Sequence, residues 1–189
     1  MSNLLKKANR KKIYNLSSLI RYNHLMHARS ENVAEHSFYV ALYTMELCRI
    51  LELSDHERMC AVERAIIHDV HEVVTSDIPH NVKQHFPVIR TELEKFEKMY
   101  NDEVFTKHNR EYSNLDRKDL IDNIVCFADV LSVLQYAENE ISFGNKSFEA
   151  VKDDAKERIE VYISRIIGYN ISEVAKDEIL SLLNSIRTN

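Results

Sequence analysis

Most of the chain follows one pattern, in which apolar residues recur every three or four positions and polar residues fill the places between them. This spacing puts the apolar side chains on one face of an α-helix. The stretch from Val33 to about Leu53 is an example, because Val40 and Leu47 fall on the same face as His36. This stretch therefore predicts a core-facing helix that carries a histidine on its apolar side.

Seven segments follow the helical pattern and none follows the alternation of a strand convincingly, which predicts an all-α fold, a helical bundle of about seven helices. The third helix has a clear start, because Ser54 and Glu57 form a Ser-x-x-Glu capping box. The expected helices are about Leu4–Tyr22, Val33–Leu53, Ser54 to His68-Asp69 with an end that blurs through Glu72 to Thr75, Pro87–His108, Leu115–Glu140, Ser147–Ile167 and Ser172–Ile186. The expected connections are an ordered loop over 21–32, a loop over Asp77–His80, a link over Asn109–Ser113 and a break at Gly144-Asn145.

The composition agrees with this picture. The 189 residues suit a single domain that spans residues 1–189, and only 2 Gly and 2 Pro argue against a turn-rich β-fold. The formal net charge of −5 gives no overall basic surface, so no nucleic-acid partner is expected. The local basic run, Lys6-Lys7 with Arg10-Lys11-Lys12, is interpreted as a solvated helix face.

The cysteines and the apolar stretches indicate the compartment. The 3 cysteines form no Cys-x-x-Cys pair and lie in apolar helical stretches, as small core residues of a reduced compartment do. The first apolar stretch is short and interrupted by Lys and Arg, unlike a signal peptide. The sequence contains no run of roughly 18 apolar residues, so no membrane span is predicted. We therefore expect a cytoplasmic protein without a membrane partner.

Four ionisable residues stand on apolar helices or at their ends: His36, His68, Asp69 and Asp129. An isolated buried charge costs many kcal/mol, so the adjacent pair His68-Asp69 needs a shared partner, and a divalent ion would satisfy both side chains. A bundle can bring such residues together from different helices. Two imidazoles and two carboxylates suit Mn, Fe, Co or Zn, with Mg also possible, and leave open positions for a water and a substrate oxygen.

Each of these residues also has a structural interpretation. A lone histidine on an apolar face, such as His36, is more often a hydrogen-bonded core residue. Asp129 alone would cap a helix or pair with an arginine. His71 turns away from His68 and is expected at the surface or in a supporting position. The run from His71 to Thr75 is not His-Glu-x-x-His, which excludes a zinc peptidase.

The order His36, His68-Asp69, Asp129 resembles the HD-domain metal phosphohydrolases. The surrounding residues narrow the resemblance to the small bacterial 5'-deoxynucleotidases of the YfbR type, over about residues 14–150. The matching stretches are Asn32-Val33-Ala34-Glu35-His36-Ser37, His68-Asp69-x-x-Glu72, Asp77-Ile78-Pro79-x-x-Val82-Lys83, and Ala128-Asp129 with the later Glu138-Asn139-Glu140.

This resemblance implies a single HD-type phosphohydrolase domain that forms a homodimer and removes the 5'-phosphate from deoxynucleoside monophosphates with one divalent transition metal. Carried over by position, the metal ligands would be His36, His68, Asp69 and Asp129. The catalytic residues would be Glu72 and Asp77 in acid–base roles and Arg21, which would orient the phosphate. The substrate-binding residues would be Arg21, Tyr22, Asp69, Asp77, Ile78, Pro79, His80 and Lys83.

One position departs from that family. Its members usually carry Arg-Trp in the first loop, where this chain has Arg21-Tyr22 and contains no Trp. A tyrosine ring can still stack on a sugar or hydrogen-bond to it, so the departure bears on substrate preference.

Three other functions are alternatives to the 5'-deoxynucleotidase. A deoxynucleoside triphosphohydrolase would need more cations, for which Lys83, Arg29 and the N-terminal basic run are candidates. An alarmone hydrolase carries Glu-Asp after the HD helix, where this chain has Glu72-Val73, so it ranks low. A non-catalytic HD module that binds a nucleotide or a partner is disfavoured, because the metal-ligand set is intact and Arg21 and Glu72 are present.

Overall fold

The computed structural model describes residues 6–188 and is built from helices. Over this range the only β pairing is an isolated antiparallel bridge between Ile20 and Asn32, so the all-α prediction is confirmed. The helices are α1 (Lys7–Tyr14), α2 (Val33–Ile50), α3 (Asp55–Ile67), α4 (Glu72–Thr75), α5 (His80–His85), α6 (Pro87–Val104), α7 (Thr106–Ser113), α8 (Lys118–Ser142), α9 (Glu149–Ile167) and α10 (Glu173–Thr188), with 3-10 turns at Asn15–Ser18 and Lys146–Phe148.

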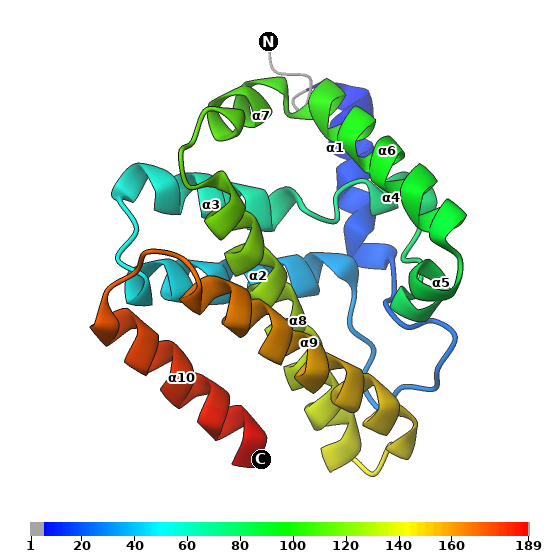
Figure 1. Ribbon diagram of the computed structural model, residues 1–189. Helices are drawn as coiled ribbons and strands as arrows, with labels where there is room; N and C mark the ends of the chain where they lie inside the picture. Colours follow the sequence, from blue (N-terminus) through cyan, green and yellow to red (C-terminus); the bar gives the residue numbers. More distant parts are fainter. Residues whose placement is uncertain (1–5, 189) are drawn as a thin grey trace.

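Helix α8 is the centre of the packing (Figure 1). It packs against α2, α3 and α9, and α10 covers the outer side of α9. The fully buried side chains of α8 include Ile121, Ile124 and Phe127. Helix α8 is long and apolar enough to cross a membrane, but 67% of its most apolar window is buried inside the fold. It is therefore the core helix of the bundle.

Two of the predicted helices end earlier than expected. The helix expected over Leu4–Tyr22 ends as an α-helix at Tyr14, and its first two residues lie outside the described part. After Tyr14 the chain tightens into a 3-10 turn, where the Ser17 hydroxyl donates a hydrogen bond to the Tyr14 carbonyl. Serine side chains that bond to nearby backbone in this way compete with helical geometry.

The helix expected over Pro87–His108 stops at Val104, and the expected link at Asn109–Ser113 is part of helix α7. The chain changes direction at Phe105 because the segments before and after it pack in different hydrophobic clusters. Val104 packs in a small core cluster with Leu16, whereas Tyr112 belongs to the main core. Both helices are regular, so the periodicity alone did not reveal the break at Phe105.

The ordered loop predicted between α1 and α2 is held by a buried carboxylate of α8. Glu140, 1% exposed, accepts hydrogen bonds from the backbone N–H groups of Ala28 and Arg29 at 2.7 and 2.8 Å. The Asn145 amide donates a third, at 2.7 Å. The two backbone hydrogen bonds join residues more than a hundred positions apart and fix the loop that contains Arg21.

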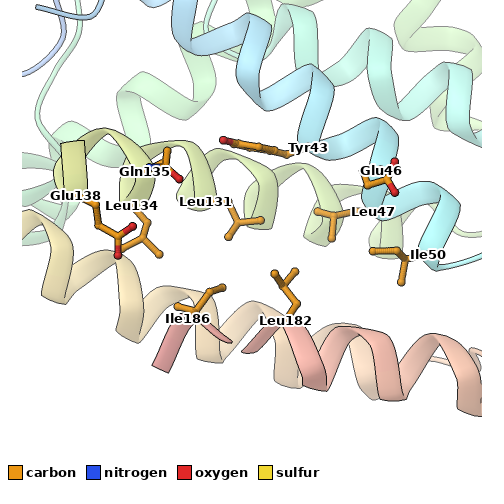
Figure 2. A pocket seen from close by; sticks show the side chains of 10 residues that line it. All are labelled: Tyr43, Glu46, Leu47, Ile50, Leu131, Leu134, Gln135, Glu138, Leu182 and Ile186. Carbon is orange, nitrogen blue, oxygen red and sulfur yellow. The ribbon is translucent and has the colours of Figure 1, made fainter. Parts of the chain in front are cut away.

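An apolar groove runs between α10 and the pair α2 and α8 (Figure 2). Leu131 of α8 and Leu182 and Ile186 of α10 face it, and Tyr43 and Leu47 of α2 close its other side. None of its lining residues belongs to the predicted site, so the groove is a separate feature.

Replacing Glu140 by alanine is expected to lower the free energy of unfolding by about 2–4 kcal/mol, because two buried backbone N–H groups lose a charged acceptor. Urea denaturation measures the change. Glu138→Ala is the control, since the Glu138 side chain is more exposed and lies 3.8 Å from the Lys152 ammonium. That variant should lose less than about 1 kcal/mol. Equal losses in the two variants would contradict a clamping role for Glu140.

Candidate metal centre

Three elements deliver the four predicted metal ligands to one place. His36 lies in the first turn of α2, which begins at a capping box of Asn32 and Glu35. His68 and Asp69 follow α3 directly, and Asp129 lies midway along α8. Because α2 and α3 both pack on α8, the bundle core brings the side chains together.

The distances define a compact group. Nε2 of His36 is 3.1 Å from Oδ1 of Asp129 and 3.7 Å from Oδ2 of Asp69, and Nε2 of His68 is 3.1 Å from the same Asp69 oxygen. One donor atom each of His36, His68 and Asp69 lies within 4.8 Å of the others. That separation is close to what metal bonds of about 2.1 Å allow. Asp129 joins this group through its short approach to His36.

The two imidazoles are oriented for a ligand. Nδ1 of His68 lies 2.7 Å from the Ala65 carbonyl and Nδ1 of His36 lies 3.0 Å from the Ser132 hydroxyl. Such partners fix the ring and leave Nε2 as the ligating atom. Both Nε2 atoms are buried and make no hydrogen bond within the described chain. Two orphaned ring nitrogens beside two carboxylates fit a divalent metal ion.

The charges of the group agree with this fit. Burial alone would raise the pKa values of Asp69 and Asp129, but the nearby histidines hold both below their usual range. Burial and the Arg21 charge lower the pKa of His36 to about 4. Burial also opposes charge on His68, yet the Asp69 carboxylate raises its pKa to about 9. Both carboxylates are thus ionised at neutral pH, as metal ligands must be, and His68 would release a proton on binding a metal.

Glu72 and His71 lie just after the ligand pair. Glu72 begins the short helix α4 and is 3% exposed, so it is a buried carboxyl group and not an exposed one at a helix end. Burial, with the charges of Asp69 and Asp77, raises the pKa of Glu72 to about 10. Its carboxyl group is therefore protonated at neutral pH. His71 is also buried, and its Nδ1 lies 3.1 Å from the His68 carbonyl, which is a supporting position and not a surface one.

The predicted site residues of the two loops, Arg21, Tyr22 and Asp77, contact one another near the metal ligands. Arg21 is buried and its Nη1 is 2.9 Å from Oε2 of Glu31, although its charge also acts on Asp69 and Asp129. Tyr22 has a φ of 51°, and its backbone N–H donates a 3.0 Å hydrogen bond to the Asp77 carboxylate. The Tyr22 ring stacks on Tyr136. Arg21, Tyr22 and Asp77 thus form one connected unit beside the centre.

A cleft of ≈570 Å³ opens at the centre and reaches His68, Asp69 and Asp129. Four of the predicted substrate-binding residues line it, namely Asp69, Ile78, His80 and Lys83, and so does Glu72. Arg21, Tyr22, Asp77 and Pro79 are not among its lining side chains.

The cleft also contains residues that the sequence pattern did not reveal. Its far wall carries Arg158, Tyr162 and Arg165 of α9, together with Arg64 of α3 and Arg90 of α6. In the sequence these arginines read as ordinary solvated positions of amphipathic helices. The sequence indicated an arginine only indirectly, through the interpretation of Asp129 as the partner of one. Arg158 is such a neighbour, with Nη2 3.7 Å from Oδ2 of Asp129.

Comparison with known proteins identifies the family of the chain. A family model described as 5'-deoxynucleotidase YfbR-like matches residues 10–177. A 5'-deoxynucleotidase of Yersinia pestis (strain Pestoides F) is 28% identical over 194 aligned positions, covering 96% of this chain and 95% of the relative. A 5'-deoxynucleotidase of Yersinia pseudotuberculosis serotype O:3 (strain YPIII) matches with the same identity and the same coverage.

Solved structures share the fold. An HD-domain phosphohydrolase of Listeria innocua is 19% identical, with a TM-score of 0.71, and the match covers 96% of this chain and 89% of that one. The HD phosphohydrolase DatZ of cyanophage S-2L, solved with dA and one catalytic Zn²⁺ ion, is 16% identical with a TM-score of 0.68. That match covers 95% of this chain and 96% of the other.

Replacing Asp69 by alanine is expected to weaken Mn²⁺ or Co²⁺ binding at least about tenfold, because the carboxylate oxygen that lies within 3.7 Å of the Nε2 atoms of both histidines is lost. Calorimetric titration of the metal-free protein measures the affinity, and elemental analysis measures the metal retained after purification. Glu94→Ala is the control, since Glu94 lines the same cleft but pairs with Arg90. An unchanged metal affinity in Asp69→Ala would remove Asp69 from the ligand set.

Proposed function

Because the chain belongs to the YfbR-like family of HD-domain phosphohydrolases, we propose that it removes the 5'-phosphate from deoxynucleoside monophosphates. Phosphohydrolase activity follows from the family. The monophosphate substrate is the further step, and it is supported by the curated relatives at 28% identity and by the arrangement of the site.

The observation that carries the proposal is the joint presence of a metal-ligand group and a protonated carboxyl group in one cleft. His36, His68 and Asp69 form the ligand group, and Asp129 completes the proposed set. Glu72 shares the cleft and has a raised pKa. An activated water and a leaving oxygen would thus each find a partner at one cleft, the water at the metal and the leaving oxygen at Glu72.

The proposed metal is one divalent transition ion, Mn, Co, Fe or Zn, with Mg possible. Bound at the four ligands, it would lower the pKa of a water molecule toward roughly 7 and offset the charge of the phosphate. The remaining work falls to the side chains of the protein. Uncatalysed hydrolysis of a phosphate monoester is very slow, so each must stabilise the transition state and not only the bound substrate.

Glu72 is proposed as the general acid. Its protonated carboxyl can donate a proton to the 5'-oxygen as the phosphorus–oxygen bond breaks, because burial, together with the charges of Asp69 and Asp77, raises its pKa and favours the protonated form. Asp77 accepts the Tyr22 N–H and would orient the first loop and share the acid–base task. Arg21 would orient the phosphate from its buried position behind Asp69 and Asp129.

The nucleoside is proposed to lie between the first loop and the segment Asp77–His80. Ile78 and His80 line the cleft, and Lys83 follows one turn into α5. Tyr22 would border the nucleoside from the first loop, where its ring is packed against Tyr136 and Phe148. A tyrosine held this way presents a fixed edge to a sugar, where the family usually places a tryptophan.

A deoxynucleoside triphosphate is the second candidate substrate. It is favoured by the cations beyond the centre, because Lys83 and Arg165 line the cleft and form no ion pair within residues 6–188. The homodimer and the cytoplasmic location implied at the sequence level stay predictions.

Activity on separate nucleotides distinguishes the two substrates. Purified protein loaded with Mn²⁺ or Co²⁺ is expected to release inorganic phosphate from deoxynucleoside monophosphates and to lose this activity in chelator. Chromatography of products from monophosphates, ribonucleoside monophosphates and deoxynucleoside triphosphates provides the measurement. Tripolyphosphate as the main product would establish the triphosphohydrolase instead.

Glu72→Gln is expected to keep its metal and lower kcat about a hundredfold or more, because the amide cannot donate a proton to the leaving oxygen. Steady-state kinetics and metal analysis on the same preparation measure both quantities. Glu97→Gln, which changes another cleft carboxylate, serves as the matched control. A kcat equal to that of the unmodified protein would end the proposed role of Glu72.

A further inference from the structure

Two guanidinium groups lie beside Asp129, and they differ in what they can reach. Arg21 is buried in an ion pair with Glu31, and its side chain is only 8% exposed. Arg158 comes from α9, is 22% exposed at its side chain and lines the cleft. A ligand that enters through the cleft therefore meets Arg158 directly.

Asp129 connects Arg158 to the metal-ligand group. One carboxylate oxygen, Oδ1, is 3.1 Å from Nε2 of His36, whereas the other, Oδ2, is 3.7 Å from Nη2 of Arg158. The guanidinium is thus separated from the centre by the width of a single carboxylate. A phosphate oxygen held at the centre would lie within reach of its N–H groups.

The guanidinium has donors to spare. Nη1 of Arg158 is 3.6 Å from Oδ2 of Asp154, one helical turn earlier, and this distance and the 3.7 Å to Asp129 are both longer than a hydrogen bond. Among the described residues Arg158 has these two ion pairs and no hydrogen bond shorter than 3.5 Å. Asp154 therefore holds the direction of the side chain without saturating its five N–H donors.

Arg158 also borders the segment proposed for the nucleoside. After burial, its charge is the largest influence that lowers the pKa of His80, and it acts on Tyr22 as well. The guanidinium thus stands between the centre on one side and His80 on the other. In the proposed pose, the phosphate of the nucleotide would join its sugar here.

We propose that Arg158 is a substrate-binding residue whose guanidinium donates hydrogen bonds to the phosphate oxygens, with Asp154 as its positioning residue. The planar fork matches two oxygens of one phosphate group. The inference rests on the proposed function for its substrate, but binding of the phosphate group itself can be measured without turnover.

The first test is calorimetric titration of inorganic phosphate into protein loaded with Mn²⁺. Arg158→Gln is expected to bind phosphate about tenfold more weakly or worse, since a charged two-point contact is lost. Its Mn²⁺ affinity should be equal or higher, because a positive charge near Asp129 is removed. Arg90→Gln is the control, as this arginine lines the same cleft but its guanidinium is paired with the Glu94 carboxylate.

A structural role would give a different result. It would lower the melting temperature and the Mn²⁺ affinity of Arg158→Gln together with its phosphate affinity, and that outcome overturns the proposal. Arg158→Lys is the second variant, which keeps the charge but not the fork and should recover part of the phosphate affinity. If Arg158→Gln does not fold, wild-type phosphate affinity in Arg158→Lys overturns the two-point contact, and weakened affinity supports it.

Kinetics separate this proposal from the proposed function. With deoxynucleoside monophosphates and with p-nitrophenyl phosphate, kcat/KM should fall in Arg158→Gln by a similar factor, because both substrates carry the same phosphate group. If the unmodified protein hydrolyses no monophosphate but Arg158→Gln still loses phosphate binding, the proposed function fails and the role of Arg158 stands. Phosphate affinity equal to the unmodified protein, or none in either protein, would overturn the role of Arg158.

Discussion

The burial of ionisable groups in an apolar bundle is the constraint on which this structure depends. His36 is completely buried, and it faces two carboxylates whose pKa values burial alone would raise. Histidine and carboxylate satisfy each other only in part, since two ring nitrogens remain without a hydrogen bond. A protein tolerates such an arrangement when a cation completes it. Helices α2, α3 and α8 thus hold four ionisable side chains around one small polar site.

Much of the fold and of the metal-ligand set could be predicted from the sequence. The 3.6-residue period located the long helices, and His36 on the apolar face of one of them marked a side chain that must point inward. The adjacent pair His68-Asp69 needed no tertiary information, because two neighbouring ionisable residues at the end of an apolar helix already require a partner. Asp129 was found by the same reasoning together with the family resemblance.

The remainder depends on tertiary packing, which a periodic pattern does not encode. The break between α6 and α7 follows from two separate clusters that draw Val104 and Tyr112 in different directions. The burial of Glu72 depends on how the chain turns after Asp69. Arg158 has the same local sequence context as any arginine of an exposed helical face, and only the packing of α9 against α8 brings it to Asp129.

The clamp that Glu140 forms on the first loop has a consequence for synthesis on the ribosome. Residues 28 and 29 are held by a side chain made more than a hundred residues later, and the metal-ligand group waits for Asp129 in the same helix. A nascent chain that ends before α8 therefore has neither a fixed loop nor a complete ligand set. Helices α2 and α3 leave the exit tunnel before α8, so the apolar faces that they pack against α8 stay uncovered until then, and such surface is a natural binding site for chaperones. Completion of α8 would then order the loop and the metal centre in a single late event.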